Sequence, residues 1–546
     1  MNLSPLRWQQ LSANYSFSEA YQQVDFFDFQ TACKQAFQQI QNAPFGSLLI
    51  VKSEILPEYL NEIEAYFNQL QNPTLLKTEY NKASLFGQTI FIPEQNRIET
   101  IEGIVQQADQ KVLILSINSL LADISLWDKL KQALLFGEYQ PYCANPIPQI
   151  LAPIKSQFKL ILLGSRDEIA TLFNYDDTLY QFGQYTEVDT YLTLDQENIQ
   201  QWINYLQTSA NKWINKTFDK KDLSQFLQAY IRESERQDLI SICPTLLRKH
   251  LIGIQEILKN PTACNVISSY FAYLENQSAK LNQFNLQDML KQQIYIETDE
   301  EEIGQINGLS VVEFDGVPYA FGEPLRISCN VQYGDGEIVD IERKVELGGN
   351  LHSKGILLAQ SCLADLLEFP TQLPFSATVA FEQSYGDIDG DSSSLAIFCV
   401  LVSALAKLPL PQGIAVTGAI DQFGNVLSVG GVNQKIEGFF NLCQARGLTG
   451  KQGVLIPQAC IAHLSLKSEL VEAVKQGQFS IWAISDVFEA TELLLNTPFY
   501  PEEQSDKPAL FDLIHQNIEQ GQERDASGTM LAKFWQQASR LIRPNS

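Results

Sequence analysis

The chain has 546 residues, a formal net charge of −26, a hydrophobic content of 45% and a charged content of 19%. A chain of this length and composition is expected to fold into about two to four domains with sizeable cores. Because an acidic chain repels phosphate backbones and no local basic patch offsets the charge, we expect no nucleic-acid partner.

The sequence has no segment typical of secretion or of membrane insertion. Residues 1–17 lack the apolar core of a signal peptide. The longest apolar run, from Leu395 to Leu410, is shorter than a membrane span and contains Ser403 and Lys407. We therefore expect a soluble, cytoplasmic protein without a membrane partner.

Scattered cysteines and histidines argue against a metal centre. The nine cysteines stand singly, without a CxxC pair, and several lie in apolar runs, which is typical of buried free thiols. The four histidines are too far apart in the sequence to make a ligand spacing: His250, His352, His463 and His515. The sequence therefore predicts no metal site.

Residues 1–185 are predicted to form an α/β domain. Helical patterns occupy residues 29–40 and 57–70. Three short apolar runs are typical of buried parallel strands: 47–51, 111–115 and 158–164. Strands that alternate with helices indicate a parallel sheet covered on both faces.

This layout is common in nucleotide-binding ATPases, but the residues that bind nucleotide are missing. A GxxxxGK[ST] loop should follow the first strand, because glycines let backbone N–H groups converge on phosphate. The residues after Val51 read KSEILP, without glycine, and Gly450-Lys451 lacks the rest of the motif. The second strand resembles the AAA+ segment that carries an Asp-Glu pair, but Leu115 and Ser116 stand there, so no carboxylate remains to hold Mg²⁺.

The third strand ends in GSRD at residues 164–167, similar to the sensor strand of AAA+ ATPases. Arg166 could serve a partner subunit, although a surface salt bridge is the commoner outcome.

Residues 186–295 are predicted to be helical, because apolar residues recur at spacings of three and four in three stretches: 201–213, 221–232 and 246–258. They resemble the AAA+ helical lid, with a simple helical linker domain as the alternative.

An acidic run at residues 297–302 marks the next boundary, and residues 296–496 are predicted to form an α+β domain. A helix is expected over residues 353–367. Five segments have strand patterns: 305–312, 325–331, 338–342, 344–347 and 377–381.

Residues 497–546 are predicted to be an extension that docks on a neighbouring subunit or stays mobile, with helices at 511–518 and 530–542.

Two segments of the α+β domain suggest nucleophilic catalysis. Residues 389–394 read DGDSSS and precede an apolar helix, and residues 430–435 read GGVNQK and open another helix after a probable hairpin. A serine hydroxyl needs a base, and a lysine can serve if burial lowers the pKa of its amine. We interpret Ser392 as the nucleophile and Lys435 as its base, with free N–H groups at the helix start as oxyanion donors.

Each segment also has a plain structural interpretation. Asp-Ser-Ser-Ser before an apolar helix is the pattern of a helix N-cap. A single lysine on a helix usually faces solvent. Taken one at a time, the segments favour these interpretations, so the catalytic hypothesis depends on their joint pattern.

The joint pattern resembles the Lon family of ATP-dependent proteases. Residues 389–397 are similar to the family's serine signature, D/E-G-P/D-S-A-G/S, although Ser393 replaces the usual alanine. Residues 416–435 are similar to T-G-x-I…G-x-V-x-x-x-G-G-x-x-x-K. The N-terminal blocks of the peptidase domain match at residues 304–309 and 346–355. The resemblance is strong over 300–496 and weak over 1–292, where it implies a degenerate ATPase and lid.

The resemblance implies a role for each site residue. Ser392 would be the nucleophile, Lys435 the general base and Thr417 the partner that orients Lys435. Asp389 and Asp391 would be acidic neighbours. If Asp391 paired with Lys435, it would keep the amine charged and silence the pair.

The sequence thus predicts a multidomain α/β and α+β protein: a degenerate AAA+ domain, a helical lid, a Lon-type peptidase domain and a C-terminal extension. Its expected function is that of a cytoplasmic serine endopeptidase that cleaves unfolded or tagged polypeptides inside a homo-hexamer. ATP and Mg²⁺ are implied by the resemblance, but the chemistry should require no cofactor. The alternatives are a catalytically silent scaffold or holdase and an ATP-driven protease with a non-standard nucleotide site.

Overall fold

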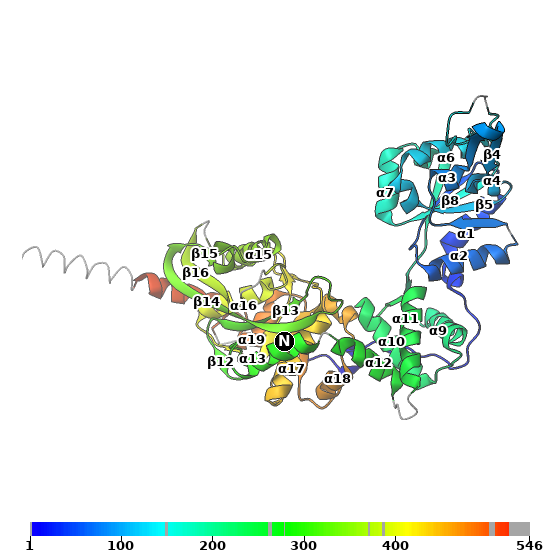
Figure 1. The fold of residues 1–546 in the computed structure, drawn as a ribbon. Helices are drawn as coiled ribbons and strands as arrows, with labels where there is room; N and C mark the ends of the chain where they lie inside the picture. The colour runs from blue at the N-terminus through cyan, green and yellow to red at the C-terminus, as the bar shows by residue number, and fades with distance from the viewer. Residues whose placement is uncertain are drawn as a thin grey trace, which may run out of the picture. The chain divides into compact units, whose positions relative to one another are not determined.

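The computed structural model describes residues 3–71, 73–147, 151–259, 265–277, 279–369, 372–384, 388–501 and 508–523. Contacts divide the chain into two compact units (Figure 1). Unit 1 comprises Met1–Asn14, Ser224–Leu239 and Ile267–Ser546. Unit 2 comprises Tyr15–Leu223 and Ile240–Val266. The residues of the predicted catalytic site all belong to unit 1.

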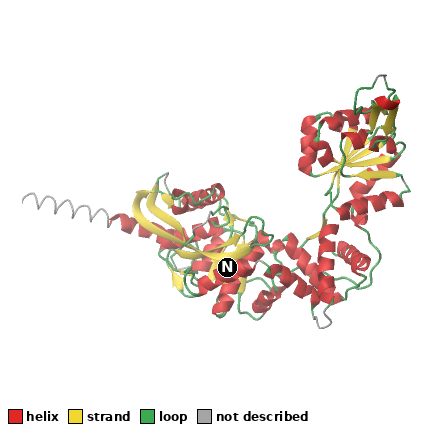
Figure 2. Ribbon diagram, in the orientation of Figure 1, coloured by secondary structure: helices red, strands yellow, loops and turns green. Residues whose placement is uncertain are grey.

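Unit 2 is built on a five-stranded parallel sheet in the order β2-β5-β8-β1-β9. The three predicted strands are confirmed, and two strands at the edges were not predicted. The bounds are β1 Leu48–Lys52, β2 Thr74–Lys77, β5 Val112–Ser116, β8 Lys159–Gly164 and β9 Gly183–Glu187. The three central strands are almost wholly buried because helices lie on both sides of the sheet (Figure 2).

Helices and small hairpins surround this sheet. The predicted helices are α1 Thr31–Asn42 and α2 Pro57–Gln69. The others are α3 Lys82–Phe86, α4 Ile104–Gln107, α5 Ile117–Ala122, α6 Ser125–Phe136, α7 Arg166–Tyr175 and α8 Leu179–Phe182. The hairpins pair β3 Gln88–Ile92 with β4 Arg97–Ile101, and β6 Glu138–Tyr139 with β7 Ile154–Lys155.

The segment after β1 differs in sequence from a glycine-rich phosphate-binding loop. The connection to α2 contains no glycine, and α2 opens with Pro57, which has no N–H to offer an anion. At the end of β5, Leu115 and Ser116 are both buried. Arg166 forms a salt bridge of 2.8 Å with Glu187 at the surface of the same unit, which is the commoner of the two outcomes expected for it.

The predicted helices between residues 186 and 295 are confirmed. They are α9 Asn198–Ile214, α10 Lys220–Ser234 and α11 Pro244–Leu258, followed by α12 Val266–Asn276 and α13 Ala279–Leu290. The short strands β10 Tyr191–Thr193 and β11 Leu239–Ser241 pair within this region. Pro244 begins α11, where its fixed φ suits the first helical turn.

Unit 1 contains a seven-stranded mixed sheet in the order β15-β16-β14-β13-β18-β21-β22. The strands are β13 Gln305–Val312, β14 Phe321–Gly336, β15 Ile338–Asp340, β16 Leu373–Glu382, β18 Ile414–Val416, β21 Gly453–Pro457 and β22 Ser480–Ile484. Strand β13 pairs antiparallel with β14 and parallel with β18. The α+β prediction for this part of the chain is therefore confirmed.

The strand predicted at residues 344–347 is wrong. Strand β15 ends at Asp340, and the chain turns into the short helix α14 Ile341–Lys344. The reason lies at the sheet edge. The carboxylate of Glu342 accepts the backbone N–H of Phe381 at 2.9 Å, so a side chain takes the place of a continued strand next to β16.

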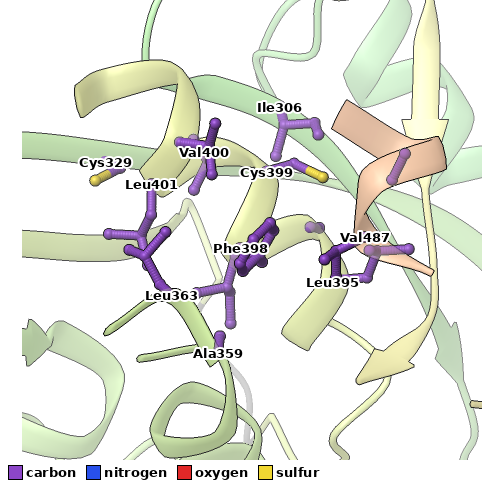
Figure 3. Packing of buried hydrophobic residues seen from close by; sticks show 14 of the residues in the cluster. Ile306, Cys329, Ala359, Leu363, Leu395, Phe398, Cys399, Val400, Leu401 and Val487 are labelled. Carbon is purple, nitrogen blue, oxygen red and sulfur yellow. The ribbon is translucent and has the colours of Figure 1, made fainter. Parts of the chain in front are cut away.

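The apolar run after the serines forms α16 Ser394–Ala406, which is buried along nearly its whole length. Figure 3 shows its side chains packed against Leu363 of α15, Ile306 of β13 and Val487 of α19. The bounds of these helices are α15 Asn350–Leu366 and α19 Val487–Leu495. Helix α16 ends where Lys407 adopts a left-handed conformation with φ 57°, so it is shorter than the apolar run.

The segment that carries Lys435 is α17 Val432–Arg446, after the hairpin of β19 Ala419–Ile420 and β20 Val426–Leu427. Gly431, with φ 62°, precedes the helix in a conformation that favours glycine. Helix α17 also crosses β14 at very close range. A Cβ on Gly438 would lie 2.1 Å from the carbonyl oxygen of Gly322, and a Cβ on Gly322 would lie 1.9 Å from that of Gln434.

Unit 1 also contains the short strands β12 Glu301–Glu302 and β17 Leu410–Pro411, the 3-10 helices Trp8–Gln10 and Gln458–His463, and α18 Ser468–Lys475. Residues 510–523 are helical, in agreement with the helix predicted at 511–518, and the helix predicted at 530–542 lies outside the described residues. Within the part of the chain that the structure describes, no helix has the length and apolarity to span a bilayer.

The contact between α17 and β14 predicts that Gly438→Ala is destabilising. Alanine is the better helix former by about 1 kcal/mol, but here its methyl group would collide with the backbone of Gly322. We expect the thermal midpoint of the full-length protein, followed by circular dichroism, to fall by several degrees. The matched control is Gly430→Ala, where no atom lies within 4 Å of the added Cβ. Equal midpoints for the two variants would contradict the importance of this contact.

Candidate active site

The fold brings the predicted serine and lysine together. The Nζ atom of Lys435 lies 3.0 Å from the Oγ atom of Ser392 and 3.3 Å from the Oγ1 atom of Thr417, and it donates to both. Ser392 lies two residues before α16, Thr417 directly after β18, and Lys435 in the first turn of α17. The loop before α16, the residue after β18 and the first turn of α17 therefore supply the three side chains.

The amine of Lys435 is almost completely shielded from solvent. The residue is only 4% exposed and lies in a helix whose apolar residues belong to a buried cluster that includes Ile436, Phe439 and Phe440. Burial lowers the pKa of Lys435 to about 8, while Cys460 and Asp391 act in the opposite direction. The amine therefore loses its proton much closer to physiological pH than an exposed lysine does, which is what a general base requires.

The loop of Ser392 is tied to the strand that ends at Val416. The carbonyl oxygen of Ser392 accepts the N–H of Gly418 at 2.9 Å and the hydroxyl of Thr417 at 3.4 Å. The buried hydroxyl of Ser394 donates to the carbonyl of Asp391 at 2.8 Å and accepts the N–H of Ile420 at 2.9 Å. These bonds fix the position of the Ser392 backbone.

Sequence reasoning did not single out Ser394 or Gly418. The sequence signal for Gly418 was its position directly after Thr417. In the structure, a Cβ atom on Gly418 would lie 2.8 Å from the side chain of Leu395. The sequence signal for Ser394 was the run of three serines, a pattern that also fits a helix cap. In the structure Ser393 occupies the N-cap position of α16, and its side chain makes no capping hydrogen bond.

The two acidic neighbours have different positions. Asp389 accepts the backbone N–H groups of Leu351 at 2.9 Å, His352 at 3.3 Å and Gly390 at 3.1 Å through its Oδ1 atom. It therefore fastens the loop before Ser392 to the first turn of α15. Among the ion pairs of the described residues, none joins Asp391 to Lys435, although Asp391 raises the pKa of the amine.

The start of α16 offers fewer free amides than the sequence suggested. The N–H of Ser394 donates to the carbonyl of Asp391 at 3.0 Å, and that of Leu395 donates to the carbonyl of Gly418 at 3.1 Å. The prediction that the N–H groups at the start of the helix are free is therefore wrong for Ser394 and Leu395. An oxyanion at this site would have to bind backbone N–H groups that precede Ser394.

An ion pair with a buried carboxylate holds α17 two residues beyond Lys435. Glu437 is 6% exposed and accepts both terminal nitrogens of Arg232, at 2.6 and 2.7 Å. Arg232 comes from the end of α10 and also donates to the carbonyl of Ser465 at 3.0 Å. A paired buried charge is costly to break, so this contact steadies the helix that positions the amine. No sequence pattern had marked these residues.

Comparison with known proteins places these residues in a family context. Residues 380–496 match the Lon protease (S16) C-terminal proteolytic domain, a range that includes Ser392, Thr417 and Lys435. Residues 71–186 match the LonB-like AAA domain.

Two bacterial relatives align over most of the chain. The Haemophilus influenzae protein named "Putative Lon protease homolog" is 46% identical over 444 residues, which are 80% of this chain and 74% of that protein. The chain belongs to the Lon protease family. The Escherichia coli protein of the same name is 40% identical over 439 residues, which are 78% of this chain and 72% of that protein. Within the Lon family, an archaeal Lon protease from Methanocaldococcus jannaschii is 32% identical over 189 residues, 33% of this chain and 27% of that protein.

The predicted resemblance to the Lon family is therefore confirmed. So is the multidomain α/β and α+β fold class, because the AAA match falls on unit 2 with its parallel sheet and the proteolytic match falls on unit 1 with its mixed sheet.

Proposed function

We propose that this Lon-family protein is a serine endopeptidase whose nucleophile is Ser392 and whose general base is Lys435. The observation that carries the proposal is the 3.0 Å contact between the lysine Nζ and the serine Oγ. A hydrogen bond of this length allows direct proton transfer once the amine is neutral. The burial of Lys435 supports the neutral form.

The chemistry balances with these residues alone. Neutral Lys435 accepts the hydroxyl proton of Ser392 as Oγ bonds to the scissile carbonyl carbon. The ammonium then donates that proton to the leaving amine as the C–N bond breaks. A water molecule attacks the acyl-serine with Lys435 again as base, which releases the carboxyl product and restores the hydroxyl.

Thr417 and the loop amides have supporting roles in this proposal. The Thr417 hydroxyl accepts a hydrogen bond from Nζ at 3.3 Å and limits the directions in which the amine can point. The amides of Ser392 and Ser393 are the candidates for stabilising the developing oxyanion, because those of Ser394 and Leu395 are already bonded. Asp389 acts indirectly, because its hydrogen bonds to α15 fix the position of the loop that leads to Ser392.

The substrates proposed are unfolded or tagged polypeptides, cleaved in the cytoplasm inside a homo-hexameric ring. This part of the proposal rests on the family, whose members act on polypeptides. No nucleic-acid partner is included, because the chain carries a net charge of −26.

Ser392→Ala is expected to abolish hydrolysis of casein and of fluorogenic peptides, because no oxygen remains to attack the carbonyl. The thermal midpoint should hardly change, since the residue lies outside the core. The matched control is Ser393→Ala, which removes a neighbouring hydroxyl and should retain most activity. A serine-directed fluorophosphonate should label the parent protein at Ser392 and leave Ser392→Ala unlabelled.

The opposite outcome would favour the silent scaffold or holdase. An unlabelled, inactive parent protein that still suppresses aggregation of unfolded substrates would support that function. Turnover that persists in Ser392→Ala would remove this serine from the mechanism.

The pKa of Lys435 predicts a rise of kcat/KM with pH. Since only the neutral amine accepts the proton, activity should increase as pH rises through about 8 and level off above it. Asp391 raises this pKa, so Asp391→Asn should move the midpoint of the rise to lower pH. Asp389→Asn serves as the control, because Asp389 is bonded to backbone amides of α15. A profile that is flat between pH 6 and 10, or falls, would exclude Lys435 as the base.

We further propose that hydrolysis does not require ATP. The support is the absence of glycine after β1, the proline at the start of α2 and the missing carboxylates at the end of β5. Casein degradation should proceed equally with and without ATP and Mg²⁺, and isothermal titration of the full-length protein with ATP and Mg²⁺ should show no binding. Stimulation by ATP together with saturable binding would reveal a non-standard nucleotide site.

A further inference from the structure

Three side chains with metal-binding chemistry converge in unit 1, outside the proposed active site. They are Asp340 at the end of β15, Glu342 in α14 and His352 in the first turn of α15, and Figure 1 shows α15 beside β15. One ligand atom from each lies within 4.8 Å of the others. The residues are adjacent because α14 turns the chain away from the sheet edge and α15 packs back against it.

The polar atoms of this cluster are buried without hydrogen bonds. His352 is 0% exposed and Glu342 is 4% exposed. Among the described residues, both ring nitrogens of His352, both carboxylate oxygens of Asp340 and the Oε2 atom of Glu342 lack a hydrogen-bond partner. Burying an unpaired polar group costs a few kcal/mol, and native proteins rarely leave several together.

The contacts within the cluster do not replace the missing bonds. The Nε2 atom of His352 lies 3.4 Å from the Oδ2 atom of Asp340, a charge contact without hydrogen-bond geometry. The second oxygen of Glu342 is occupied by the N–H of Phe381 at 2.9 Å, which fixes the direction of the free oxygen. A hydrogen bond that fixes the orientation of a ligating carboxylate, as the N–H of Phe381 does for Glu342, is typical of metal sites.

We propose that Asp340, Glu342 and His352 form a binding site for a divalent transition-metal ion, Zn²⁺ or Mn²⁺. Two carboxylates and a neutral imidazole supply two negative charges, which one such ion neutralises, and the mixed donor set suits these ions. With bonds of about 2.0–2.2 Å, ligand atoms around a tetrahedral ion are about 3.3–3.6 Å apart. The 3.4 Å between Nε2 of His352 and Oδ2 of Asp340 already fits this spacing. The carboxylate of Glu342, within 4.8 Å of the others, would move toward them when the ion binds.

The site is connected to the segment that leads to Ser392. His352 offers its backbone N–H to Asp389, and the N–H of Gly349 donates to the carbonyl of Ile388 at 2.8 Å. Helix α15 and the Ile388–Asp389 segment are thus bonded together. An ion that fixes the His352 side chain would reduce the motion of this segment, three residues before Ser392.

The test uses the untagged full-length protein after treatment with a chelator, in a Cys143→Ser background that removes an exposed thiol. We expect one equivalent of Zn²⁺ or Mn²⁺ to bind in equilibrium dialysis, and Co²⁺ to give a ligand-field absorption spectrum. The thermal midpoint should rise on addition of the metal. Amide hydrogen exchange should slow in residues 388–394.

Three variants make the assignment specific. Glu342→Gln keeps an acceptor for the N–H of Phe381, and Asp340→Asn keeps the side-chain shape, so both should fold while losing at least about tenfold in affinity. His515→Gln is the matched control, since this histidine bonds to the carbonyl of Phe511 within its own helix. It should bind metal like the parent protein.

Several outcomes would overturn the proposal. One is the absence of stoichiometric binding by the parent protein. Another is binding that survives in both Glu342→Gln and Asp340→Asn, which would place the ion elsewhere. If metal leaves the thermal midpoint unchanged while Asp340→Asn lowers it, the cluster is a buried histidine–aspartate ion pair. The hydrogen-exchange experiment needs no variant, so it decides the matter even if a substitution prevents folding.

Discussion

The hydrogen bond from the amine of Lys435 to the hydroxyl of Ser392 sets the requirements that the rest of unit 1 meets. An amine whose pKa is lowered from 10.5 to about 8 is held in a place that disfavours its charge, at a cost of roughly 1.4 kcal/mol per pKa unit. That cost of a few kcal/mol is offset by apolar packing. This packing comes from α16, which is almost wholly buried, and from the apolar side of α17. Helix α17 carries Lys435, and α16 begins two residues after Ser392.

The contact further depends on how closely backbones approach one another. Gly322 and Gly438 allow β14 and α17 to touch without intervening side chains, and Gly418 allows the end of β18 to meet the first turn of α16. The first approach fixes α17, which carries Lys435, and the second fixes the start of α16, two residues after Ser392. The ion pair of Arg232 with Glu437 then prevents α17 from shifting. Precise spacing at the site is thus produced by elements that need not contact a substrate.

The architecture of unit 2 does not depend on the residues that follow its strands. Its parallel sheet is held by buried apolar strands such as β5 and β8, whose packing is independent of the loop that follows β1. The core therefore requires neither a glycine in that loop nor a carboxylate at the end of β5. The match to the LonB-like AAA domain therefore describes the architecture of this part of the chain, and the loop residues decide whether nucleotide can bind.

The sequence by itself determined the family, the central strands of the parallel sheet and the serine and lysine that the fold brings within 3.0 Å of each other, because these depend on local periodicity and on short motifs with fixed spacing. It failed where a long-range contact overrides local pattern. The alternating residues at 344–347 have the pattern of a strand, yet the hydrogen bond between Glu342 and Phe381 replaces the continuation of β15, which ends before these residues. The spacing of the histidines predicted no metal site, yet folding places His352 beside the carboxylates of Asp340 and Glu342. Only the tertiary structure could decide which distant polar groups share a site, since the packing of helices on sheets, and no sequence interval, sets those distances.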